Sequence, residues 1–389
     1  MNNFDDVVNR LGTYSTQWDY TFDRFGRSDV LPFSISDMDF KSPPEILKAL
    51  SERINHGVFG YSRWNHSDYK SAITQWYTNR FNYKINDDWI MYIPSVIYGI
   101  NKVFEVLGNK NDTVLFLSPA YDNFYKSLTA NQQKFITSHL IVEDNQFVIN
   151  WQDFEAKLQH SKYFLLCNPH NPTGRVWTED ELTKIVVLAK KYGVLIVSDD
   201  IHMDIVYKPH KFTPVLKVAE QLDYLDKVLV ITSASKSFNT PSLGGAYALI
   251  RNAEIYKKLM AKIKEADALG SPMILGIIAT MTAYEKSAYW LDNLVEYCYN
   301  NMIILQNFLK EHFPEVKMLP PEGTYLAWID VSSMGKTSAE IQNLLINKGK
   351  LGIMSGDVYG EEKPFLRLNV GCPKSKLLLG LDKFKESFQ

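Results

Sequence analysis

The sequence predicts an α/β protein whose main sheet is mostly parallel and is covered by helices on both faces. Short apolar strands alternate with amphipathic helices along the middle of the chain, which is typical of parallel strands joined by helical crossovers. Hydrophobic residues make up 46% of the 389 residues, enough for a sizeable core, and this excludes a disordered chain. A chain of this length favours one large domain and a smaller one.

The first predicted helix begins at Ser42–Glu45 and runs to about Gly57. Ser-Pro-Pro-Glu is typical of a helix start, because serine can cap the first turn and proline fits within it. Trp89–Ile93 is the first predicted strand of the large domain. The helix that follows it carries apolar residues at helical spacing, at Ile97, Ile100, Val103, Phe104 and Leu107.

Four further strands are predicted, each ending in polar residues. They are Thr113–Leu117, Tyr163–Cys167, Val194–Ser198 and Lys227–Thr232. A helix lies between the second and third of them. Thr178 and Glu181 form a capping box at its start, and Gly193 ends it.

The pattern changes after Ala288, where a long helix, about Tyr289–Phe313, leads into a second α/β region. We therefore predict a large domain of residues 50–287. A small domain would consist of residues 1–49 and 288–389.

Charge and cysteine content exclude several classes of partner. The 42 basic and 44 acidic residues give a net charge of −2, and the absence of a basic block argues against nucleic acid. No apolar run is long enough to span a bilayer, and the polar first ten residues are not a secretory signal. The three cysteines, Cys167, Cys298 and Cys372, are odd in number and far apart, so they predict neither a disulfide framework nor a metal cluster. We expect a cytoplasmic protein that binds neither membranes nor nucleic acid.

Ligands bind at the carboxyl ends of strands in open parallel sheets, and a lysine follows one of these ends. Lys236 lies just past the strand Lys227–Thr232, among the hydroxyl residues Ser233 and Ser235. Burial beside the core would lower the pKa of its amine and make it a nucleophile able to form a Schiff base. A lone Ser-Lys pair, however, more often belongs to a solvated loop.

Acidic residues follow another strand end. Asp199, Asp200, His202 and Asp204 come after Val194–Ser198. Carboxylates are costly to bury unless they are paired, so one of them is expected to meet a metal, an arginine or a protonated heterocycle. A helix cap or a set of surface acids explains the same residues, and the segment alone does not decide.

The other strand ends offer a turn, an anion site and an aromatic ring. Residues 168–174, Asn-Pro-His-Asn-Pro-Thr-Gly, strongly favour a turn because they contain two Asn-Pro pairs and a glycine. The amide of Asn171 could also hydrogen-bond a ligand oxygen. The helix start at Ser95–Ile97 presents free N–H groups suited to a phosphate. Tyr121 brings a ring to the same edge, although such a tyrosine more often belongs to the core.

One arginine stands out in the C-terminal region. Phe365–Val370 alternates as a strand, and Arg367 shares a face with Asn369. A guanidinium binds a carboxylate through two parallel hydrogen bonds. Taken alone, an arginine on such a strand is more often a surface residue.

Taken together and in this order, these residues resemble the pyridoxal-phosphate enzymes of the aspartate aminotransferase fold, or fold type I. The resemblance covers about residues 37–370. It is carried by Asn168–Gly174, Ser198–Asp199, Ser233–Lys236 and Arg367. It implies a large cofactor-binding domain with a mostly parallel sheet and a smaller α/β domain.

The resemblance implies a role for each residue at the strand ends. Lys236 would form the Schiff base with pyridoxal 5′-phosphate, and Asp199 would pair with the pyridine nitrogen. Asn171 would hydrogen-bond the phenolic oxygen, helped by His202, and Tyr121 would stack on the ring. No metal is implied.

The phosphate and the substrate complete the expected site. The residues expected to hold the phosphate are Val96, Ile97, Ser233 and Ser235. Tyr61 would reach the phosphate of a neighbouring subunit, which implies a homodimer with shared active sites. Arg367 would bind the α-carboxylate of a small amino-acid substrate.

Within this fold the sequence resembles most the MalY/PatB branch, the cystathionine β-lyases or cysteine-S-conjugate β-lyases. The segments that carry this likeness are Ser36–Phe40, Ser198–His202 and Lys236–Asn239. Gly244 stands where most aminotransferases have a phosphate-binding arginine, which the lyase branch also lacks. Asp200 in place of the usual glutamate and Ser95 in place of glycine are departures that leave the ring and phosphate contacts open.

The resemblance implies a C–S β-lyase that acts on L-cystathionine or related cysteine S-conjugates and releases a thiol, pyruvate and ammonia. An aminotransferase is the alternative, because it would use the same residues. A metal-dependent hydrolase using Asp199, Asp200, His202 and Asp204 is another, although it leaves Lys236 without a role. A regulatory binding role stays open as a second activity.

Overall fold

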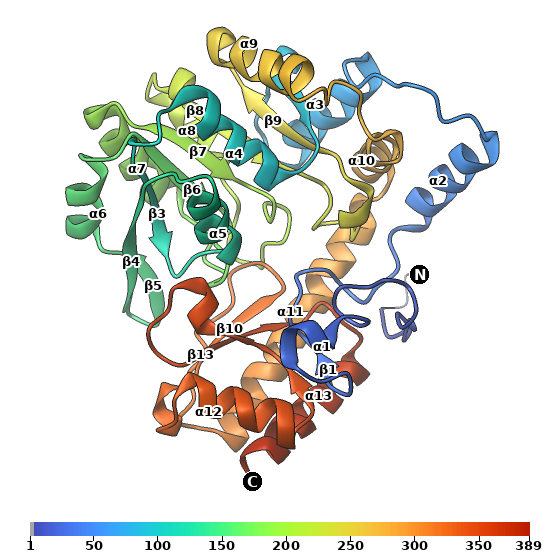
Figure 1. Cartoon of the computed structure of the whole chain (residues 1–389), viewed down its shortest axis with the longest axis vertical. Helices are drawn as coiled ribbons and strands as arrows, with labels where there is room; N and C mark the ends of the chain where they lie inside the picture. Colours follow the sequence, from blue (N-terminus) through green and yellow to red (C-terminus); the bar gives the residue numbers. More distant parts are fainter. Residues whose placement is uncertain (1–3) are drawn as a thin grey trace.

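The computed structural model describes residues 4–389 and contains, in that range, a central sheet of eight strands (Figure 1). The strand order is β2-β9-β8-β7-β6-β3-β4-β5. The bounds are Ile90–Ile93 (β2), Val114–Ser118 (β3), Phe135–Glu143 (β4), Gln146–Ile149 (β5), Tyr163–Cys167 (β6), Leu195–Asp199 (β7), Val228–Thr232 (β8) and Ala246–Ile250 (β9). The five central strands, β8 to β4, are parallel to one another, whereas β2, β9 and β5 pair antiparallel at the two ends. The predicted α/β class with a mostly parallel sheet is confirmed.

Helices cover both faces of this sheet because successive side chains of a strand point to opposite sides. In β3, Leu115 and Leu117 pack into the core that includes α3, α6, α7, α8 and α10, whereas Val114 and Phe116 pack with α4, α5 and α9. The bounds of these helices are Ser67–Phe81 (α3), Val96–Leu107 (α4), Asp122–Ala130 (α5), Trp151–Leu158 (α6), Glu179–Tyr192 (α7), Val215–Gln221 (α8), Ala253–Ala261 (α9) and Ile274–Lys286 (α10).

Helix α7 begins and ends as its sequence predicts. The Thr178 hydroxyl accepts from the Glu181 N–H, and the Glu181 carboxylate accepts from the Thr178 N–H, which completes the capping box. Gly193 ends the helix in the left-handed region, with φ of 70°.

Helix α2, Pro44–His56, begins at the predicted place, but Ser42 does not cap it. The residue at the cap position is Pro43, which has no side-chain donor or acceptor, and proline occupies the first turn as expected. The Ser42 hydroxyl donates instead to the Asn239 carbonyl oxygen at 3.0 Å. It lies one residue too early to reach the first turn, and it joins this helix to the segment that carries Lys236.

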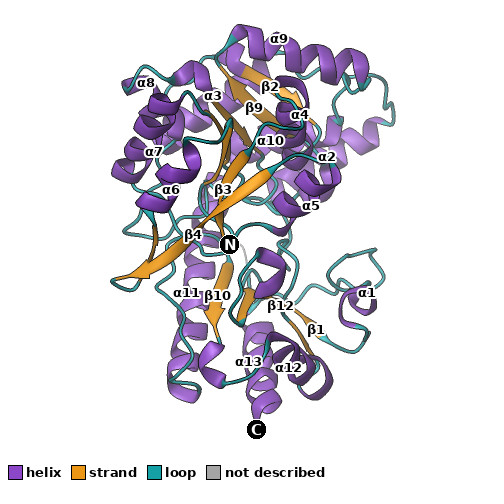
Figure 2. Cartoon of the chain, turned by 60° about the vertical axis from the view of Figure 1, so that its left-hand side comes forward, coloured by secondary structure: helices purple, strands orange, loops and turns teal. Residues whose placement is uncertain are grey.

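A second group of elements lies below the large sheet in Figure 2. It is formed by the chain after the long helix α11, Ala288–His312, together with the N-terminal elements α1 and β1. Its antiparallel sheet has the order β10-β13-β12, and a parallel pair, β1 and β11, joins it to the N-terminal segment. The bounds are Thr21–Phe25 (α1), Leu31–Pro32 (β1), Leu326–Asp330 (β10), Ser338–Asn343 (α12), Leu351–Gly352 (β11), Met354–Ser355 (β12), Phe365–Asn369 (β13) and Lys374–Phe388 (α13).

The division into residues 50–287 and residues 1–49 plus 288–389 stays a prediction. Its first boundary falls inside α2, which packs on α10. Within residues 4–389, no helix is both long and apolar enough to cross a bilayer.

Candidate active site

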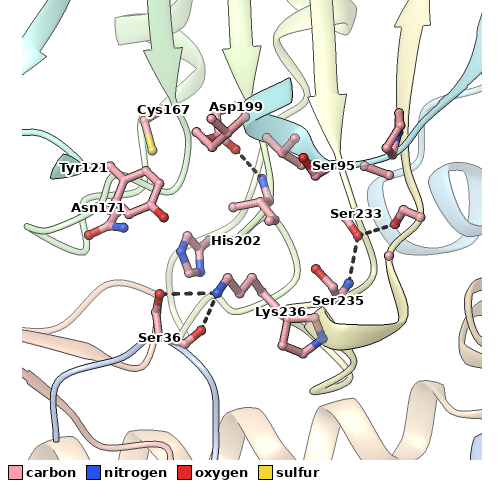
Figure 3. Close-up of a pocket in the computed structure, with 18 residues that line it drawn as sticks. Ser36, Ser95, Tyr121, Cys167, Asn171, Asp199, His202, Ser233, Ser235 and Lys236 are labelled. Carbon is pink, nitrogen blue, oxygen red and sulfur yellow. Dashed lines mark hydrogen bonds between the residues drawn. The ribbon is translucent and has the colours of Figure 1, made fainter. Parts of the chain in front are cut away.

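A cavity of about 190 Å³ lies at the carboxyl ends of β6, β7 and β8, where a parallel sheet presents its ligand site. The predicted residues that line it are Val96, Ile97, Tyr121, Asn171, Asp199, His202, Ser233, Ser235 and Lys236. Figure 3 shows Asp199, Tyr121 and Asn171 on one side of it and Ser95, Ser233 and Ser235 on the other. These residues come from the ends of five separate strands and meet in one place.

Lys236 extends across the cavity toward the segment before α2 (Figure 3). Its Nζ donates to the Ser36 carbonyl oxygen and, at 3.3 Å, to the Ser36 hydroxyl. Burial lowers the pKa of Lys236 to about 8; Asp37 and Asp199 oppose this shift. The neutral amine, which is the nucleophilic form, is therefore more populated near neutral pH than in a lysine of ordinary pKa.

Asp199 is the last residue of β7 and faces the cavity with 3% of its surface exposed. Its Oδ1 accepts from the Ile201 N–H at 3.2 Å, and burial raises the pKa of Asp199 to about 7. Because a buried carboxylate is costly as an anion, a cation beside it would be strongly favoured. The protonated nitrogen of a pyridine ring is such a cation.

His202 is buried beside Asp199, and its Nδ1 has no hydrogen-bond partner within the described residues. Burial lowers the pKa of His202 to about 3, with Lys236 and Arg367 acting in the same direction. The imidazole is therefore neutral near pH 7 and keeps one N–H to donate. An unpartnered buried nitrogen on the cavity wall fits a ligand oxygen.

The opposite wall is suited to a phosphate. Val96 and Ile97 are the first two residues of α4, a helix of 12 residues whose N-cap is Ser95, and both line the cavity. The positive end of the helix dipole and the N–H groups of the first turn therefore lie at the cavity wall. The Ser233 hydroxyl donates to the Gly245 carbonyl oxygen at 2.8 Å and accepts from the Ser235 N–H at 3.2 Å. The N–H groups that begin α4 suit the predicted phosphate, whereas the Ser233 hydroxyl proton is already donated to Gly245.

Gly244 cannot be replaced by a larger residue without strain. Its φ is +68°, and a Cβ atom there would lie 2.3 Å from the Met273 sulfur. The local backbone therefore favours glycine at position 244, where most aminotransferases would have an arginine, and Gly244 contributes no side chain to the wall that is suited to a phosphate.

Arg367 is buried, with 4% of its surface exposed, in contrast to the surface position that its strand alone favours. Its Nη1 donates to Asn171 Oδ1 at 3.1 Å and its Nη2 donates to the Ser34 carbonyl oxygen at 2.9 Å. The guanidinium lies over the Tyr359 ring, 4.6 Å from its centroid. The Asn171 bond places this cation next to the cavity, where it can bind a carboxylate.

Tyr61 does not reach this cavity. It is fully exposed and lies with Ser62 and Arg63 around a separate depression. Its predicted contact with a neighbouring subunit's phosphate is not tested by a single chain and stays a prediction.

One contact that the motifs do not assign joins residues 36–40 to residues 236–239, two of the segments that resemble the lyase branch. Asn239 donates from Nδ2 to the Met38 and Phe40 carbonyl oxygens at 2.9 and 2.7 Å, and it accepts from the Met38 N–H at 3.0 Å. The Ser36 carbonyl oxygen accepts hydrogen bonds from Lys236 Nζ and, at 3.0 Å, from the Tyr325 hydroxyl. The sequence contains both motifs, 36–40 and 236–239, but it does not indicate that they contact each other, because they are brought together only by the tertiary structure.

The acidic residues after β7 do not converge as a metal site. Asp200 accepts from the Ser198 hydroxyl, and Asp204 accepts from Trp76 Nε1 at 3.0 Å and from the Ser237 hydroxyl at 2.7 Å. In the part of the chain from residue 4 onward, no three His, Cys, Asp or Glu side chains are grouped to hold a metal ion. The geometry therefore favours a cofactor ring at Asp199 over the hydrolase alternative.

Comparison with known proteins agrees with this geometry. The family model "Aminotransferase class I and II" matches residues 28–384. The chain is 40% identical to protein MalY of Escherichia coli K12, over 98% of this chain and 97% of that protein, and 35% identical to cystathionine beta-lyase PatB of Bacillus subtilis 168, over 98% and 99%. The structure of the PLP-bound C–S lyase from Staphylococcus hominis is similar with a TM-score of 0.91 and 27% identity, covering 99% of this chain and 97% of that one. The chain therefore belongs to the aminotransferase class I and II family, and its cofactor is pyridoxal 5′-phosphate.

Proposed function

We propose that this protein, a pyridoxal-phosphate-dependent carbon–sulfur β-lyase, acts on L-cystathionine or a related cysteine S-conjugate. The reaction is an α,β-elimination that gives a thiol, pyruvate and ammonia. The observation that carries the proposal is that Lys236 and Asp199 line one cavity and that Arg367 donates a hydrogen bond to Asn171 on the wall of the same cavity. Support for the lyase reaction comes from the relatives, since PatB is named as a cystathionine beta-lyase and the Staphylococcus hominis protein as a C–S lyase.

The residues around the cavity would hold the cofactor as follows. When bound, pyridoxal phosphate supplies an electron sink that stabilises negative charge at the substrate Cα. Asp199 would keep the proton on the pyridine nitrogen, and Asn171 and His202 would hydrogen-bond the phenolic oxygen. The phosphate would lie on the N–H groups of α4 and on Ser233 and Ser235, with Tyr121 against the ring.

Lys236 and Arg367 act on the substrate. Arg367 would bind the α-carboxylate through two parallel hydrogen bonds and so fix the direction of the Cα–H bond. Lys236 would hold the cofactor covalently between turnovers. In its neutral form the Lys236 amine would then take the proton from the substrate Cα as general base, after which the Cβ–S bond breaks.

We also infer a homodimer in a cytoplasmic setting. Apolar side chains are exposed on α2 and on the loop after it: Leu47, Ile54, Val58, Phe59 and Tyr61. An exposed group of this kind is typical of an interface. Cys167, Cys298 and Cys372 are free and buried, which fits a reducing compartment.

The decisive assay measures pyruvate released from L-cystathionine by purified protein without a keto-acid acceptor. The proposal expects many molecules of pyruvate per active site, with an equal amount of thiol. An aminotransferase would stop after at most one turnover and leave pyridoxamine phosphate, and that result would replace the lyase by the alternative.

A further inference from the structure

Two arginines meet at Ser34. Arg24, in α1, donates from Nη1 to the Ser34 hydroxyl at 3.3 Å, and Arg367, in β13, donates from Nη2 to the Ser34 carbonyl oxygen at 2.9 Å. Because both acceptors belong to one residue, the two donor nitrogens lie within about 10 Å of each other. Arg367 is buried and Arg24 is exposed, so Arg24 lies on the solvent side of the pair.

Neither of these arginines forms an ion pair with a carboxylate of the described residues. The arginines that do are Arg10, Arg27, Arg80, Arg175 and Arg251. Asp122 acts electrostatically on Arg24, but it is already paired with Lys126 at 2.6 Å. Two like charges held together without a neutralising partner are unfavourable by themselves and attract anions.

The position of Arg24 is defined by packing. The neighbouring Phe25 ring lies so close to Gly352 of β11 that a Cβ atom there would approach it to 2.6 Å. Tyr359, whose ring lies under Arg367, also acts electrostatically on Arg24. Ser36, two residues beyond Ser34, lines the cavity, so the arginine pair lies along the same segment as the cavity wall.

We propose that Arg24 binds the distal carboxylate of a thioether that carries an amino-acid group at each end, while Arg367 binds the carboxylate next to the reacting carbon. This inference rests on the proposed function and adds the residue that would recognise the distal end of the substrate. L-Cystathionine is such a compound: its two carboxylates are joined by seven bonds and stand roughly 9 Å apart when extended. Two guanidinium groups held on one serine, with donor nitrogens no more than about 10 Å apart, can each reach one of these carboxylates.

The test compares two thioethers that differ at the distal end. L-Cystathionine carries the second carboxylate and S-ethyl-L-cysteine does not, and pyruvate reports on both. Arg24→Ala should lower kcat/KM for L-cystathionine by roughly 10- to 100-fold, mainly through KM, which is the loss expected for one charge-assisted contact. The same variant should change kcat/KM for S-ethyl-L-cysteine by less than about 3-fold.

Two further variants serve as controls. Arg27 lies in the same segment, but it is paired with Asp29 and contacts no residue of the cavity. Arg27→Ala should therefore leave kcat/KM unchanged for both thioethers. Arg24→Lys keeps the charge and should recover part of the L-cystathionine activity.

Each other outcome overturns the inference. An equal loss on both thioethers would assign Arg24 a structural role, and no loss on either would show that the distal carboxylate is not bound there. If the unaltered protein released no pyruvate from either thioether, the proposed function itself would fail. The two failures are distinguishable, because the unaltered protein stays active if only the role proposed for Arg24 is wrong.

Discussion

Replacing Arg367 by alanine removes the cation that the account assigns to the substrate α-carboxylate. The guanidinium is buried and already oriented by Asn171 and Ser34, so it can offer its remaining N–H groups without further ordering. Two charge-assisted hydrogen bonds are worth about 1.5–3 kcal/mol each, or about 3–6 kcal/mol together. At 1.4 kcal/mol per factor of ten, kcat/KM for L-cystathionine should fall by roughly 10²- to 10⁴-fold.

The assay is pyruvate release measured with varied substrate, together with the cofactor's absorption and the urea midpoint of each variant. Arg367→Lys keeps the charge but loses the planar fork, so its loss should be smaller, about 10- to 100-fold. A loss below about 3-fold in Arg367→Ala, with the cofactor still bound, would refute this role for Arg367.

Three more variants test the surroundings of the cavity. Asp204→Ala leaves the buried donors of Trp76 and Ser237 unpaired, so urea denaturation should show a free energy of unfolding lower by about 2–4 kcal/mol. Asn239→Ala removes three hydrogen bonds between the Asn239 side chain and the backbone of the segment before α2, and it should lower the free energy of unfolding by about 2–3 kcal/mol in the same experiment. In cofactor-free protein, burial raises the pKa of Asp199 to about 7, so the folded state binds more protons than the unfolded state between about pH 4 and 7. Stability relative to Asp199→Asn should therefore fall as pH rises through that range, and a rise would contradict the assignment.

The strand ends and their residues could be predicted because each signal is local. The apolar run of β8 and the Ser-x-Ser-Lys that follows it lie within ten residues, and the rule for parallel sheets places their junction at a ligand edge. Helix α7 is defined equally locally by Thr178, Glu181 and Gly193. Such patterns survive in the structure because tertiary packing agrees with them.

The remaining features depend on contacts between distant segments. Lys236 meets Ser36 across 200 positions of sequence, and Arg367 meets Ser34 across 333. The periodicity of a sequence does not predict contacts between such distant residues. For this reason the sequence around Arg367, taken alone, favours a surface position. Strand β9 was also not predicted: it follows β8 without an α-helix between them and pairs with it antiparallel, so it lies outside the alternation of strands and helices on which the prediction rests.

The most direct test of the central claim is to find where pyridoxal phosphate is attached. The protein is reduced with borohydride, which makes the link to lysine permanent, and the modified peptide is identified by mass spectrometry. One modified residue per chain is expected, Lys236, and the modification should be lost in Lys236→Ala. Attachment at another lysine, or none at all in a protein that carries the cofactor, would contradict the assignment of this cavity as the active site.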